Sequence, residues 1–162
     1  MTVLRAAAAP RAFAERMGVF FESDGLPRIA GRVFGLLLVS GEPRSLDELA
    51  AMLGVSKASV STDTRLLERR GLVERVGRPG DRRTFYQVVN DLPRHSMEFR
   101  MERLRKFRAM IADARRSGSI PGRQVMQRLR GLDTTYALVI DAMAQALEHS
   151  HRRRQRAVAA RR

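Results

Sequence analysis

Polar side chains that could bind the edges of DNA bases are concentrated between residues 56 and 65. Lysine, serine, threonine and arginine supply hydrogen-bond donors and acceptors, and their spacing places several of them on one face of a helix. Such a face can enter the major groove, where each base pair presents its own pattern of donors and acceptors. The predicted contacts are Ser56, Lys57, Ser59, Ser61, Thr62 and Arg65.

A second basic cluster follows in the glycine- and proline-containing segment GRPGDRR, residues 77–83. The segments on either side, 72–76 and 84–89, are rich in β-branched and aromatic residues, which predicts a β-hairpin. Arginines at the tip of a hairpin can lie along phosphates or enter a narrow minor groove. The candidate wing residues are Arg78, Asp81, Arg82 and Arg83.

These two clusters need a scaffold, and the preceding residues predict a helix-turn-helix. Ser45 and Glu48 have the spacing of a capping box, which opens a short helix. Gly54 then allows a tight turn, Ser56 caps a second helix, and Gly71 ends that helix in a left-handed conformation. Three residues have structural roles in this motif. Ala50 is the small residue where the two helices cross, Gly54 forms the turn, and Val60 is the apolar residue that anchors the second helix to the first. We expect Ala58, Val60, Leu66 and Leu67 to face inward.

The pattern of apolar residues predicts helices in the rest of the chain, so the predicted fold class is mainly α with a small β-hairpin. Apolar residues recur at helical intervals over residues 13–21, and again after Pro27 until about residue 40. A long charged helix is predicted for residues 92–116, and another begins at about residue 123. The predicted divisions are an N-terminal helix at 1–24, a winged helix-turn-helix at 25–91, C-terminal dimerisation helices at 92–150, and a flexible basic tail at 151–162.

The last predicted helix carries a heptad-like apolar seam that needs a partner surface. Its members are Val125, Leu129, Leu132, Tyr136, Val139 and Met143, and the pattern extends to Ala146. A homodimer would bury this seam and would place two reading helices about one DNA turn apart. Packing against another helix of the same chain is the alternative, and the sequence leaves it open.

Charge and composition narrow the class of function. The 162 residues contain 31 Lys and Arg against 17 Asp and Glu, a net charge of +14, which favours a polyanionic partner. The chain has no cysteine, and we find no phosphate-binding glycine loop, HExxH motif or nucleophile elbow. We therefore expect no enzyme activity, no cofactor and no metal site. No apolar run is long enough to span a bilayer and no signal peptide is evident, so we expect a cytoplasmic protein without a membrane partner.

The stretch SLDELAAMLGVSKASVSTDTRLLERRGLVERVGRPGDRRTFYQV resembles the winged helix-turn-helix of MarR-type bacterial transcriptional regulators. The preceding GLPRIAGRVFGLLLVSGEPRSLDELA resembles the GbsR-like branch of that superfamily. The resemblance implies double-stranded DNA as partner, a homodimer formed by the terminal helices, and an acidic wing residue that braces a minor-groove arginine. Asp81 and Arg83 occupy these last two positions, with Arg82 as an alternative contact.

The expected function is that of a sequence-specific regulator, a repressor on a palindromic operator. The resemblance also implies a small-molecule effector that releases the DNA. An aromatic cage for such a ligand could draw on the rings of Phe20, Phe21, Phe34, Phe99, Phe107 and Tyr136, and none of them is assigned to it. The alternative is a nonspecific or architectural nucleic-acid-binding protein whose affinity comes from charge alone.

Overall fold

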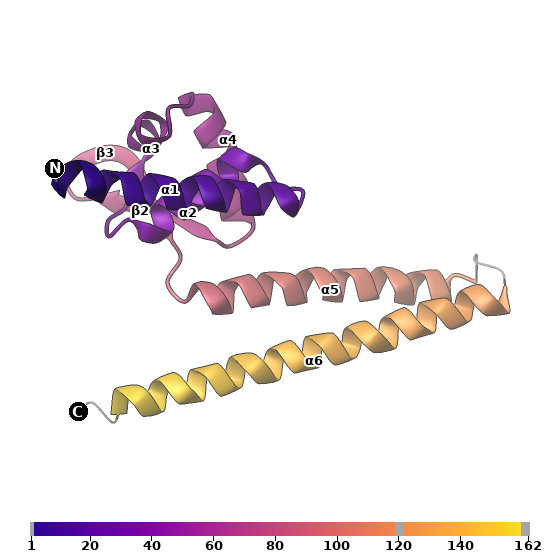
Figure 1. The fold of residues 1–162 in the computed structure, drawn as a ribbon. Helices are drawn as coiled ribbons and strands as arrows, with labels where there is room; N and C mark the ends of the chain where they lie inside the picture. Colours follow the sequence, from indigo (N-terminus) through magenta and orange to yellow (C-terminus); the bar gives the residue numbers. More distant parts are fainter. Residues whose placement is uncertain (1, 119–121, 160–162) are drawn as a thin grey trace. The chain divides into compact units, whose positions relative to one another are not determined.

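The fold is described from a computed structural model that places residues 2–118 and 122–159; the side chains of residues 2–8, 157 and 158 are not described. The chain forms two compact units, residues 1–95 and residues 96–162, which are taken one at a time. Nine helices and strands lie in the described ranges (Figure 1). Helices dominate and the sheet is small, so the predicted fold class is confirmed.

In the first unit, α1 (Thr2–Ser23) lies along α2 (Arg28–Val39) (Figure 1). The helices approach closely because glycines face the contact. A Cβ added to Gly31 would lie 2.5 Å from the Met17 carbonyl oxygen and 2.8 Å from Gly18 Cα. Helix α1 starts earlier than the predicted residue 13 and contains Pro10. The alanines at 6–9 favour helix strongly, which accounts for the extension.

The predicted helix-turn-helix is present as α3 (Leu46–Leu53) and α4 (Lys57–Arg69). Ser45 and Glu48 form a complete capping box at the start of α3. Gly54 has φ 64° and ends α3 in the left-handed region, and Ser56 caps α4 by accepting from the Ser59 amide. Gly71 follows α4 with φ 65°, a conformation that favours glycine.

The sheet has three antiparallel strands in the order β1-β3-β2, namely β1 (Arg44–Ser45), β2 (Val73–Arg78) and β3 (Asp81–Val88). The predicted hairpin is confirmed, but its strands are longer and its turn shorter than expected. The third strand, β1, was not predicted. It pairs with β3 through Ser45 opposite Phe85, so the residue that caps α3 also belongs to the sheet.

The core of the first unit lies where α1, α2, α3, α4 and the sheet meet. Its fully buried side chains include Val33, Leu49, Val60 and Leu67, contributed by three different helices. Helix α4 supplies Val60 and Leu67 at a spacing of seven residues, two turns of one face. This packing fixes which side of α4 is left for solvent.

The second unit is a pair of helices, since most of α5 (Leu92–Arg116) and all of α6 (Arg123–Ala159) belong to it. They run side by side in opposite directions (Figure 1). The rings of Phe107 and Tyr136 meet edge to face at 5.4 Å, and Asp133 accepts from Arg108 at 2.8 Å and from Arg115 at 3.2 Å.

The basic tail differs from its prediction. We expected flexible chain from residue 151, whereas α6 continues as helix through Ala159; residues 160–162 lie outside the described part. Arginine, glutamine and alanine are good helix formers, and cations at a helix C-terminus interact favourably with its dipole. Across the described helices, none combines the length and hydropathy needed to cross a membrane.

Candidate nucleic-acid interface

Helix α4 has one buried face and one polar face. Val60, Asp63, Thr64 and Leu67 are buried, so they define the inner side. Four of the predicted contacts are exposed, Ser56, Lys57, Thr62 and Arg65, while Ser59 and Ser61 are half-buried. Ala58 was expected to face inward, and that was wrong, because the side chain is exposed. The spacing from Val60 to Thr64 and Leu67 sets the inner face, and Ala58 is outside it.

The amino-terminal turn of α4 is held by local contacts. The Ser59 amide donates to Ser56 Oγ at 3.1 Å, and the two hydroxyls lie 3.0 Å apart. Lys57 Nζ lies 2.8 Å from Asp47 of α3. The sequence analysis did not identify Asp47, and a ten-residue separation across a turn gives no periodic signal for this pair. An exposed pair of this kind is weak, so Lys57 can exchange Asp47 for a phosphate.

At the tip of the wing, Asp81 and Arg83 are joined by several hydrogen bonds. Arg83 Nη2 donates to Asp81 Oδ2 at 2.6 Å, and the Arg83 amide donates to Asp81 Oδ1 at 2.9 Å. These bonds to Arg83 lower the pKa of Asp81 to about 2. Arg82 is exposed on the neighbouring position of β3. The predicted wing cations therefore lie on a strand, where their directions are set by its pleat.

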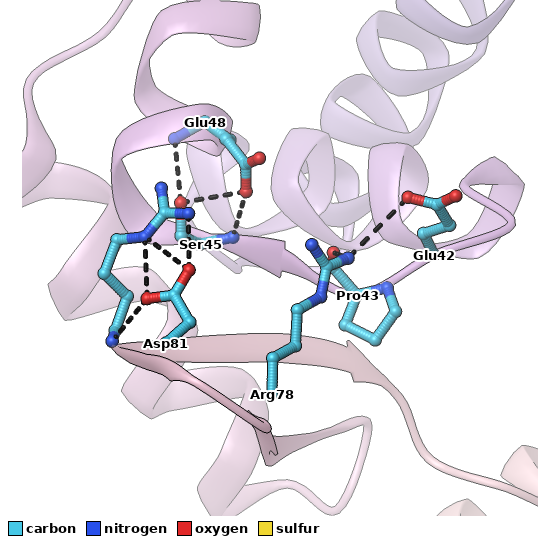
Figure 2. A network of polar contacts seen from close by, with 7 residues as sticks. Glu42, Pro43, Ser45, Glu48, Arg78 and Asp81 are labelled. Carbon is cyan, nitrogen blue, oxygen red and sulfur yellow. Dashed lines mark hydrogen bonds and ion pairs between the residues drawn. The ribbon is translucent and has the colours of Figure 1, made fainter.

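Arg78 lies differently from the other wing arginines. Its Nη2 donates to the Pro43 carbonyl at 2.9 Å and lies 3.6 Å from Glu42, as Figure 2 shows. Its Cζ lies 4.3 Å from the centre of the Phe85 ring. The guanidinium is thus engaged with the segment that leads into β1, 35 residues earlier in the chain.

The carboxylate of Glu48, in the capping box of α3, interacts electrostatically with the wing. The backbone amide of Ser45 donates to Glu48 at 2.7 Å, and its hydroxyl donates at 2.9 Å (Figure 2). These two hydrogen bonds are the main causes of the lowered pKa of Glu48, and the positive charges of Arg83 and Arg44 add to the effect. Glu48 therefore stays ionised at neutral pH and attracts the wing cation toward the start of α3.

The apolar residues of the predicted seam of α6 face two different sides of the helix. Tyr136 is turned toward α5, where it meets Phe107, and Ile140, which was not in the predicted seam, is buried. Val125, Leu132 and Val139 remain 36–40% exposed and recur every seven residues. The remaining members, Leu129 and Met143, are half-buried. One side of α6 therefore packs within the chain, and a second apolar stripe is uncovered in the single chain.

The rings considered for an effector are spread over the chain. Phe21 packs on Phe34 at 5.6 Å within the core of the first unit, and Phe107 pairs with Tyr136 in the second. Phe20 is 58% exposed on α1, and Phe99 lies below the guanidinium of Arg103 at 5.9 Å. Phe20 also meets Phe21 edge to face at 6.3 Å, so each of these rings has a packing contact and the geometry assigns none of them to a ligand. Over the described ranges, no three His, Cys, Asp or Glu side chains gather as metal ligands would.

A sequence profile of the MarR family matches residues 24–84, which include α2, the helix-turn-helix and the start of β3. Among curated proteins, the chain is similar to the HTH-type transcriptional regulator MmpR5 of Mycobacterium tuberculosis, with 46% identity over 77 residues, or 47% of each protein. It is also 33% identical over 78 residues to the HTH-type transcriptional repressor OpcR of Bacillus subtilis, covering 48% of this chain and 40% of OpcR.

These curated matches span less than half the length of each relative. A solved structure gives wider coverage. The crystal structure of a transcriptional regulator superposes with a TM-score of 0.83 at 30% identity, over 89% of this chain and 99% of the other. The similarity therefore extends beyond the helix-turn-helix, and the relatives are transcriptional regulators rather than enzymes.

Proposed function

Because this chain belongs to the MarR family of transcriptional regulators, we propose that it is a sequence-specific DNA-binding regulator that acts as a homodimer on a palindromic operator. The observation that carries the proposal is the exposed polar face of α4, with Thr62 and Arg65 in its middle, on a helix anchored by buried Val60 and Leu67. Such a helix can present donors and acceptors to base edges while its other side stays packed. Arg82 and Arg83 add cations for the backbone or the minor groove.

The homodimer is supported by apolar surface that the single chain leaves uncovered. On α6, Val125, Leu132 and Val139 recur every seven residues on one face, and their side chains are 36–40% exposed. Large apolar side chains exposed side by side indicate a protein contact. A second copy of the chain is the partner that also gives the operator its two-fold symmetry.

We further propose that the protein is a cytoplasmic repressor of the GbsR-like branch and that a small-molecule effector releases it from DNA. The branch rests on the resemblance of residues 25–50, and repression is supported by similarity to a protein named as a repressor. Such an effector would act by favouring a different separation of the two reading helices.

The test is fluorescence anisotropy of the purified protein with the DNA upstream of its own gene and with a scrambled duplex of equal length. We expect the native duplex to bind at least about a hundredfold more tightly at physiological salt. A selection of bound fragments from genomic DNA extends the test to operators elsewhere. If all genomic fragments bind equally, sequence-specific regulation is disproved.

An architectural nucleic-acid-binding protein is the second candidate, and the net charge of +14 favours it. Such a protein would bind both duplexes equally, with an affinity that falls steeply with salt. Substitution at Arg65 separates the two functions further. A charge-driven binder would lose affinity for all sequences alike, whereas a sequence reader would change its base preference at one position of each half-site.

A further inference from the structure

The contacts of Arg78 are made with the body of the first unit. Its side chain is 36% exposed, and its guanidinium donates to the Pro43 carbonyl at 2.9 Å, as Figure 2 shows. The same group lies 3.6 Å from a Glu42 carboxylate oxygen. A guanidinium that already has a carbonyl and a carboxylate as acceptors has fewer N–H groups left for a phosphate.

Phe85 extends this connection through the wing. Its ring is fully buried, with the Arg78 guanidinium carbon 4.3 Å from the ring centre and that of Arg83 at 5.2 Å. Phe85 lies opposite Val76 in β2 and opposite Ser45 in β1. One aromatic side chain therefore meets both an inward-turned arginine and the arginine at the tip of the wing.

Ser45 joins this assembly to the helix-turn-helix. It pairs with β3 as part of β1, and its hydroxyl accepts from the Glu48 amide as the cap of α3. A rotation of the wing about its base would have to break the contact of Arg78 with Pro43, the β1–β3 pairing, or both. The wing is consequently fixed relative to α3, and through the core to α4.

We propose that Arg78 is a positioning residue for DNA binding. It holds the wing against residues 42–45, so that Arg82 and Arg83 meet the backbone while α4 lies in the groove. The inference rests on the proposed DNA-binding function and differs from the expectation, made from sequence, that Arg78 is itself a DNA contact.

The salt dependence of DNA binding separates the two roles. A lost phosphate contact lowers the slope of log K against log salt by about 0.9, and a lysine in place of Arg78 would largely keep that contact. A displaced wing also takes Arg82 and Arg83 off the backbone, so the slope falls by more than one contact and lysine does not restore it. The measurement is anisotropy titration of wild type, Arg78→Ala, Arg78→Lys and Arg82→Ala on the selected duplex. Arg82→Ala is the matched control, because it removes an exposed arginine from the same hairpin.

For Arg78→Ala we expect affinity to fall at least roughly tenfold, the salt slope to fall by more than it does in Arg82→Ala, and amide exchange in residues 76–85 to rise. Arg78→Lys should show the same loss, since an ammonium group keeps the charge but cannot reproduce the planar contact with Phe85 and the carbonyl. Arg82→Ala should lower the slope. A role in global stability alone would leave the affinity of the folded protein unchanged.

Three results would overturn the positioning role while wild type still selects its duplex. They are a slope for Arg78→Ala reduced only by as much as in Arg82→Ala, full affinity in Arg78→Lys, and unchanged affinity in Arg78→Ala. If Arg78→Ala does not fold, Arg78→Gln replaces it in the measurements of slope and affinity, and Arg78→Lys is interpreted as above. Failure of wild type to select any duplex would instead disprove the proposed function, and the positioning role with it.

Discussion

Asp81 holds Arg83 in a fixed direction at the tip of the wing. Arg83 Nε donates to both carboxylate oxygens at 3.1 Å, its Nη2 donates at 2.6 Å, and its backbone amide donates at 2.9 Å. The two residues are separated by one position of β3, so both point to the same face of the strand. An arginine on a bare hairpin tip would sample many rotamers, and this carboxylate limits them before DNA arrives.

Replacing Asp81 with alanine should therefore reduce selectivity more than affinity. Arg83 would lose its brace, while the protein gains one unit of positive charge and binds any duplex more strongly. We expect the ratio of native to scrambled affinity to fall roughly tenfold in anisotropy titrations at constant salt. Because the pKa of Asp81 is about 2, the pair is ionised throughout the pH range of the assay.

Asp24→Asn is the charge-matched control for this experiment, since Asp24 lies in the exposed turn after α1. It should raise affinity for both duplexes alike and leave their ratio unchanged. An Asp81→Ala protein that behaves in the same way as the control would show that the brace has no part in selectivity.

Arg65 should determine part of the base preference. It is exposed on α4, and no hydrogen bond or ion pair to it is found in the described part of the chain. An arginine with free donors can bind the O6 and N7 atoms of a guanine, a contact that contributes about 1–3 kcal/mol of discrimination. Selection of bound sequences with Arg65→Ala should yield a motif relaxed at one position in each half-site. An unchanged motif would remove Arg65 from the reading residues.

The local signals in the sequence were sufficient for most of the first unit. The capping box of Ser45 and Glu48, the turn at Gly54 and the helix end at Gly71 depend on neighbouring residues, and all three are present. Strand β1 was missed because two residues carry no alternation, and its partner strand lies about 40 positions later. The orientation of Arg78 was missed for the same reason, since its acceptors are set by tertiary pairing.

The close contact of α1 with α2 makes Gly31 a sensitive position. A methyl group there would lie 2.5 Å from the Met17 carbonyl oxygen, and backbone cannot move aside as a flexible side chain can. We expect Gly31→Ala to lower the free energy of unfolding by about 1–3 kcal/mol in urea titrations. Gly41→Ala, where an added Cβ meets nothing within 4 Å, should change it by less than about 0.5 kcal/mol. Equal effects at both positions would refute close packing as the cause.

Asp63 should make the protein less stable as pH rises. The carboxyl group is 8% exposed on the inner side of α4, and burial raises its pKa above 3.8. The folded state then binds a proton more tightly than the unfolded state, so stability falls as pH rises from about 3.8 through the raised pKa. We expect Asp63→Asn to stabilise the protein at pH 7 and to have less effect at pH 3.5, measured by thermal unfolding. A larger gain at the lower pH would contradict this assignment.

The exposed stripe of α6 should carry the dimer contact, and one charge placed in it should separate the subunits. Leu132 is 40% exposed and lies between Val125 and Val139, which are 36% and 39% exposed one heptad to either side. A buried arginine there would lack a partner, so Leu132→Arg should shift the mass at micromolar concentration from dimer to monomer in light scattering. Thr134→Arg adds the same charge about 200° round the helix and should leave the dimer intact.

If Leu132→Arg remains dimeric while wild type is dimeric, the interface must lie on another surface. A helical circular dichroism spectrum matching wild type would show that loss of the dimer is not loss of the fold.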